Sequence, residues 1–121
     1  MPRVDSYREL VAWQKAMELV VAVYRETALW PADERFGLTS QVRRAAVSVP
    51  ANIAEGSGRS GPAEMRHSLS VAHGSLCEAQ THLEIAEQLG FLSPSSAQRL
   101  SGQCVEISRV INGLKRSLAA R

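Results

Sequence analysis

Arginine is the residue type in this sequence best suited to chemical recognition, and its positions are clustered. The candidates form one group between residues 43 and 66 and a second near the C-terminus: Arg43, Arg44, Arg59, Arg66, Lys115 and Arg116. Guanidinium groups form forked hydrogen bonds with phosphate and with carboxylate oxygens. The arginines could therefore bind the phosphates of RNA or DNA, or pair with carboxylates across the subunits of an oligomer. The net charge of only +2 agrees better with subunit pairing.

Residues that could support catalysis are present, but their spacing does not form a site. His67, His73 and His82 are six and nine residues apart, so no two of them share a helix face as a zinc-binding pair would. We interpret Cys77 and Cys104 as small side chains of the core, where a thiol is unreactive. The "GSGRSG" segment lacks the Gly-Lys-Ser/Thr ending of a phosphate-binding loop. We expect no enzyme activity, no cofactor, no metal and no small-molecule substrate.

The composition indicates one globular domain over residues 1–121. Hydrophobic residues make up 45% of the chain and charged residues 21%, which is ordinary for a domain of this length. The N-terminal "MPRVDSYREL" contains no apolar signal region, and no apolar run approaches the roughly 20 residues of a membrane span. We therefore expect a cytoplasmic protein that does not contact a membrane.

Four helical segments are predicted, over residues 7–28, 34–56, 62–89 and 94–118. Ser6 with Glu9 forms a capping box for the first segment, Gly90 ends the third, and Ser93 with Pro94 begins the fourth. The apolar residues of the first segment recur at helical spacing and predict its core face: Leu10, Trp13, Met17, Val20, Val21 and Tyr24. The connections are short, so the fold class is an all-α, antiparallel, up-down-up-down four-helix bundle.

Two details of this bundle bear on function. Pro50 lies inside the second segment, and its ring presses on the preceding turn, so we expect that helix to be kinked or to end there. Several valines lie off the main apolar stripes and predict a second apolar face that is covered in a homo-oligomer: Val11, Val20, Val23, Val71, Val105 and Val110.

Three segments carry a resemblance to a known family: "LVAWQKAMELVVAVYRET", "FGLTSQVRRAAVSVPANIAEGSGR" and "GSLCEAQTHLEIAEQLGFL". They resemble the bacterial four-helix-bundle proteins, also called the 23S rRNA intervening-sequence protein family, over about residues 6–117. The resemblance implies a homo-oligomeric bundle, a pentamer with a central channel, whose relatives mostly have no established activity. It also implies kinship with the accessory protein of diversity-generating retroelements, a basic bundle that binds nucleic acid.

The residues that match the family pattern suggest a structural role for the proline region. Besides Arg43 and Arg44, they include Trp13, Gln41, Ser48, Pro50, Asn52, Glu55, Gly56, Gly74 and Glu78. We expect Ser48 and Asn52 to satisfy backbone groups freed by Pro50, and Glu55 to pair with Arg43 or Arg44. We also expect Gly74 to let its helix approach a neighbour closely.

Two hypotheses for function follow from these patterns. The first is a non-enzymatic oligomer that binds structured RNA or DNA through the arginines. The alternative is an assembly scaffold for a protein partner, in which the arginines pair subunits and the proline region locks the structure.

Overall fold

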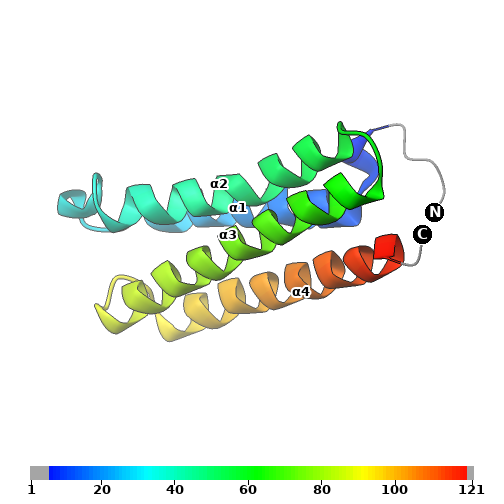
Figure 1. Cartoon of the computed structure of the whole chain (residues 1–121). Helices are drawn as coiled ribbons and strands as arrows, with labels where there is room; N and C mark the ends of the chain where they lie inside the picture. Colours follow the sequence, from blue (N-terminus) through cyan, green and yellow to red (C-terminus); the bar gives the residue numbers. More distant parts are fainter. Residues whose placement is uncertain (1–5, 120–121) are drawn as a thin grey trace.

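The computed structural model describes residues 6–119, and every regular element in that range is helical. Four α-helices follow one another in antiparallel order: α1 Val11–Thr27, α2 Leu38–Ser57, α3 Pro62–Gln88 and α4 Pro94–Ala119. Two 3-10 turns complete the list, η1 Tyr7–Glu9 and η2 Ala32–Glu34. Figure 1 shows the α1–α2 and α3–α4 turns at one end of the bundle and the α2–α3 turn at the other. The predicted all-α four-helix bundle is confirmed.

The helices form a closed ring, because each packs on its neighbours in sequence and α1 also packs on α4. The most extensive of these interfaces is the one between α2 and α3. At the end of the bundle that carries the α1–α2 turn, the buried Trp30 ring packs on Phe91 with 6.2 Å between centroids. This contact joins the α1–α2 turn to the α3–α4 turn. None of the helices in the described range is both long and apolar enough to cross a bilayer.

The Ser6 cap does not begin the α-helix as predicted, and Glu9 does not complete a capping box with it in the described contacts. The Ser6 hydroxyl accepts a hydrogen bond from the Arg8 amide at 3.1 Å, but it caps only the short turn η1. Leu10 is then extended, with φ −75° and ψ 125°, so the α-helix begins at Val11 rather than at residue 7. Trp13 packs edge-on against Tyr7, with 5.3 Å between ring centroids, and fixes η1 on the helix.

The core face of α1 is not the one predicted from its large apolar residues. Its buried residues are Ala12, Ala16, Leu19, Val23 and Thr27. Met17, Val21 and Tyr24 are exposed instead, and Leu10, Trp13 and Val20 are only half-buried. The reason is steric, because the alanine-bearing face lets α1 lie close to its neighbours. The larger apolar side chains are therefore left on the outside of the bundle.

The core faces of the other helices agree with the sequence pattern. All six predicted residues of α2 are buried: Leu38, Val42, Ala45, Ala46, Val49 and Ile53. The apolar residues that recur at helical spacing in α3 are buried as well: Met65, Leu69, Ala72, Leu76, Ala79, Leu83 and Ala86. On the predicted face of α4, Ala97 and Leu114 are half-buried, and the others are buried: Leu100, Cys104, Ile107, Ile111 and Leu118. Helix α2 does not end at Pro50 but continues through it to Ser57, with the proline ring buried.

The predicted turn signals around α3 and α4 hold as well. Gly90 has φ +82°, which favours glycine, and the Phe91 amide donates to the Ala86 carbonyl at 2.9 Å. The Ser93 hydroxyl accepts from the Ser96 amide at 3.1 Å and caps α4. These local signals fix the ends of two long helices, and with them the positions of the side chains between.

Candidate nucleic-acid interface

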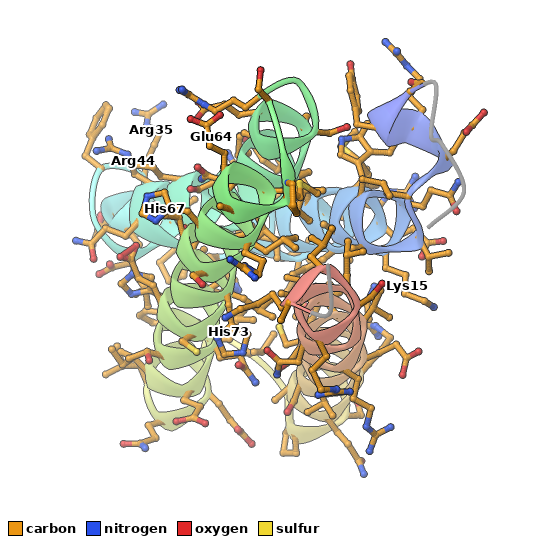
Figure 2. All side chains as sticks on the ribbon, turned by 45° about the vertical axis from the view of Figure 1, so that its right-hand side comes forward. Lys15, Arg35, Arg44, Glu64, His67 and His73 are labelled. Atoms are coloured by element: carbon orange, nitrogen blue, oxygen red, sulfur yellow. The ribbon has the colours of Figure 1, made fainter. Side chains whose placement is uncertain are left out.

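The first turns of α2 form one wall of an open groove of about 430 Å³ beside the end of α1. We call it the arginine groove, and its lining residues are Tyr24, Arg35, Phe36, Thr39, Ser40, Arg43, Arg44 and Val47. Figure 2 shows Arg35 and Arg44 projecting outward from the same side of the bundle. The lining contains three arginines, three hydroxyl side chains and no carboxylate, so its charge is positive.

Arg43 is the fixed member of the groove. Its Nε donates to the Thr27 hydroxyl at 2.8 Å, and that hydroxyl in turn donates to the Val23 carbonyl at 2.7 Å. The guanidinium carbon lies 4.4 Å from the centre of the Tyr24 ring, within cation–π range. Arg43 therefore joins α2 to the end of α1, and one edge of its guanidinium group is occupied inside the protein.

Arg44 and Arg35 are the available members. Both side chains are exposed, and neither forms an ion pair with any residue between 6 and 119. The Arg35 guanidinium carbon lies 5.2 Å from the centre of the Phe36 ring, which is itself 88% exposed. Two unpaired cations and an uncovered aromatic ring thus stand at the mouth of the groove.

The other predicted arginines lie elsewhere. Arg59 follows the far end of α2, about 20 Å from Arg44 along the helix axis at 1.5 Å per residue. It pairs with Glu55 at 3.4 Å, so within one chain Glu55 does not pair with Arg43 or Arg44, and a pair with these arginines of the next subunit stays a prediction. Arg66 is half-buried near the start of α3. The structure thus divides the expected cluster between the two ends of α2.

The C-terminal basic pair, Lys115 and Arg116, lies at the same end of the bundle as Arg59. Lys115 and Arg116 lie in the last turns of α4, at the same end of the bundle as the α2–α3 turn (Figure 1). Neither of them forms an ion pair with another residue that the structure describes. Glu9, Glu55 and Glu64 come from the elements at this end, so its arginines have nearby carboxylates and the arginine groove has none in its lining.

The proline region forms a separate feature, which we call the polar lock and define as Ser48, Asn52 and Ser75. The Asn52 amide donates to the Ser48 carbonyl at 2.8 Å and to the Ser48 hydroxyl at 2.9 Å. The Ser48 hydroxyl meets the Ser75 hydroxyl of α3, also at 2.9 Å. One turn beyond Asn52, Gly56 is buried so closely against Ser68 that an added Cβ would lie 2.5 Å from the Ser68 Cβ. The lock and this glycine hold α2 against α3.

The remaining matched residues do not join the lock. Gln41, Gly74 and Glu78 are exposed, and an added Cβ at Gly74 would meet nothing within 4 Å. Within one chain, the close approach expected at Gly74 is therefore made by Gly56 instead. Trp13, in α1, is half-buried and packs against Tyr7 of η1.

Comparison with known proteins decides the family. The profile of the 23S rRNA-intervening sequence proteins matches residues 8–113. The chain belongs to this family. A crystal structure from Bacteroides thetaiotaomicron, described as a protein of unknown function from the S23 ribosomal protein family, has the same fold, with a TM-score of 0.78 and 19% identity. The match covers 87% of this chain and 98% of that one. No curated protein matches the sequence.

For this member of the intervening-sequence family, the histidines and cysteines do not assemble a metal site within the described range. Cys77 is exposed, so its assignment to the core was wrong, whereas Cys104 is buried. Burial raises the pKa of the Cys104 thiol to about 12, with a smaller contribution from Cys77. His73 lies one turn before Cys77, with 3.9 Å from Nδ1 to the sulfur, and its Nε2 is 2.9 Å from the Ser108 hydroxyl. The contact between His73 and Ser108 joins α3 to α4.

Six residues of the arginine groove were missed in the sequence: Tyr24, Arg35, Phe36, Thr39, Ser40 and Val47. Tyr24 was assigned to the core, because its spacing matched the large apolar residues of α1. Arg35 and Phe36 lie in the turn before α2, where no periodicity exists to indicate which way a side chain points. The available signal was the "RFG" sequence itself, an arginine and an aromatic residue beside a glycine in a turn.

Proposed function

We propose that this protein is a non-enzymatic, self-associating bundle that binds structured RNA or DNA through its arginines. The observation that carries the proposal is the arginine groove, whose lining holds three arginines and no carboxylate. Arg35 and Arg44 have no ion pair in the described range, so no carboxylate there competes with a ligand for their guanidinium groups. Cations of this kind bind phosphates by releasing counterions, which makes the affinity strongly dependent on salt.

Self-association is supported by the outer face of α1. Met17 is 38% exposed and Val21 45% exposed, and they line a shallow depression with Ala22 between the charged side chains of Glu18 and Arg25. A helix that keeps its alanines in the core and its larger apolar residues outside is typical of a subunit contact. We extend to this chain the pentamer implied by the family resemblance, and we place α1 at its interface.

Fluorescence anisotropy with an RNA hairpin and a DNA duplex tests the binding half. We expect binding that weakens steeply between about 50 and 200 mM salt. Arg44→Ala should weaken it and reduce the salt slope by about 1. The matched control is Arg109→Ala, which removes an equally exposed arginine that already faces Glu106 at 3.9 Å. Equal effects of the two variants would contradict the groove, and no binding at low salt would contradict nucleic-acid binding altogether.

Light scattering tests the assembly. The native mass should be a multiple of the 13.2 kDa chain, five-fold for a pentamer. Val21→Glu should reduce it, because a charge at a buried subunit contact is costly. Val105→Glu is the comparison, because Val105 is 43% exposed on α4 and is one of the valines that the sequence assigned to the covered face. If α1 forms the contact, this change should leave the mass unchanged. The opposite result would place the interface on α4.

The scaffold hypothesis remains the second candidate, and the Glu55–Arg59 pair is the observation that favours it. If arginines serve mainly to pair carboxylates, Arg44→Ala should lower the oligomeric mass and leave any RNA affinity unchanged. The two measurements above therefore separate the hypotheses with the same variant.

A further inference from the structure

Phe36 is the feature of the arginine groove that phosphate binding leaves unexplained. Its ring is 88% exposed, the highest value among the large apolar residues of the described chain. Exposure on this scale forgoes most of the stabilisation that burial of a side chain of this size would provide. The backbone at Phe36 is fixed on both sides, by the turn η2 and by the buried start of α2 at Leu38.

The surroundings of Phe36 are suited to a flat ligand with a negative charge beside it. The Arg35 guanidinium lies 5.2 Å from the ring centre, and Arg44 stands on the next turns of α2. Glu34, the residue before Arg35, does not line the groove, and its Oε1 accepts a hydrogen bond from the Leu38 amide at 3.0 Å. Ser40 and Thr39 add hydroxyl groups that can donate to or accept from a base edge or a ribose.

We propose that the arginine groove binds an unpaired nucleotide, with its base stacked on Phe36 and its phosphates beside Arg35 and Arg44. This inference rests on the proposed nucleic-acid binding and specifies its ligand. Proteins that bind single strands combine a cationic track with an aromatic side chain on which a base stacks. In a duplex both faces of each base are already covered, so a paired region can satisfy the arginines but not the ring. The groove therefore selects loops, bulges or single strands.

The volume and the fixed residue agree with this assignment. A groove of about 430 Å³ falls within the range of small-ligand sites, roughly 300–1,000 Å³. Arg43 is tied to Thr27 and Tyr24 and forms a rigid inner wall. Arg35 and Arg44, which are exposed, can adjust to the path of a backbone.

The test compares an unstructured 12-nucleotide RNA with the same strand in a duplex, by fluorescence anisotropy at low salt. The wild-type protein should bind the single strand more tightly. Phe36→Leu keeps an apolar side chain but removes the stacking ring. It should weaken single-strand binding about tenfold and leave duplex binding unchanged. Phe36→Trp should restore the preference, and its fluorescence should be quenched as RNA is added.

The control is Leu29→Ala. Leu29 is 81% exposed in the same α1–α2 turn but does not line the groove, so its loss should change neither affinity. Single-strand binding that survives Phe36→Leu but falls with Arg44→Ala would overturn base stacking while leaving phosphate binding intact. Absence of all RNA binding by the wild-type protein would remove the proposed function itself. A change of oligomeric mass in Phe36→Leu would show that a second copy of the chain covers the ring, and would also overturn the proposal.

Discussion

The two halves of α2 use one continuous helix in opposite ways. Residues 48–57 pack against α3 through a buried glycine and the polar lock. In the lock, the side chains of Ser48 and Asn52 form hydrogen bonds inside the molecule. Residues 38–47 bury only one face, and their other face forms the wall of the arginine groove. The same family-matched stretch therefore contains a rigid half that fixes the helix and an open half that the fixed helix presents to solvent.

This division explains why two adjacent arginines differ. Arg43 points back toward α1 and forms hydrogen bonds with Thr27 and with the Tyr24 carbonyl. Arg44 is one residue further along the helix, and its side chain is exposed. A rotation of about 100° per residue is enough to separate a structural arginine from an available one. The comparison predicts that changes in the rigid half cost stability, and that changes in the open half cost ligand affinity.

The largest loss of stability is expected at Gly56. A methyl group there would lie 2.5 Å from the Ser68 Cβ and 2.8 Å from its hydroxyl, so α2 and α3 must move apart. Overpacking of this kind costs typically 1–3 kcal/mol, against a gain of about 1 kcal/mol in helix propensity. We expect Gly56→Ala to lower the free energy of unfolding by about 1–2 kcal/mol, measured by urea denaturation.

Gly102→Ala is the matched control for this prediction. Gly102 lies within α4, and an added Cβ would meet nothing within 4 Å. Helix propensity alone should then raise the free energy of unfolding by about 0.5–1 kcal/mol. Stabilisation by both alanines would mean that α2 and α3 are not as close as the structure has them.

The polar lock is the next test of the rigid half. Asn52→Ala removes both hydrogen bonds to Ser48, whose hydroxyl then keeps only its contact with the Ser75 hydroxyl. We expect a loss of about 1–2 kcal/mol in the free energy of unfolding, and about 1 kcal/mol for Ser75→Ala. The exposed Ser70 hydroxyl bonds only to the Arg66 carbonyl of its own helix, so Ser70→Ala should change stability by less than about 0.5 kcal/mol. A lock variant as mild as Ser70→Ala would show that the lock does not hold the interface.

The contacts of the rigid half were easier to predict from the sequence than those of the open half, for a physical reason. The core faces of α2, α3 and α4 repeat large apolar residues at helical spacing, and such a pattern is set by burial alone. The pairing of Ser48 with Asn52 was also accessible, since it is local to one helix turn. Ser75 lies 27 residues from Ser48, and nothing local indicates that their hydroxyl groups meet.

The errors in α1 and in the turn have a common origin. In α1 both helix faces are apolar, and the rule that large residues lie inside selects the wrong one when alanines allow a closer approach. At Phe36 there is no helix period to read, so its direction depends on how η2 packs. In both places, sequence reasoning failed to place exposed apolar residues. Self-association is argued from those on α1, and base stacking is argued from Phe36.

The smallest effect on stability, and the sharpest contrast, is expected between Arg43 and Arg44. Arg43→Ala loses one hydrogen bond at 2.8 Å and the contact with the Tyr24 ring, so it should lower the free energy of unfolding by about 1 kcal/mol. Arg44→Ala touches an exposed side chain without an ion pair and should change stability by less than about 0.5 kcal/mol. Urea denaturation of the two variants measures the first difference, and RNA anisotropy measures the second. If Arg44→Ala destabilises as much as Arg43→Ala, Arg44 is held by a contact within the oligomer, and the open half of α2 is then a subunit interface rather than a ligand site.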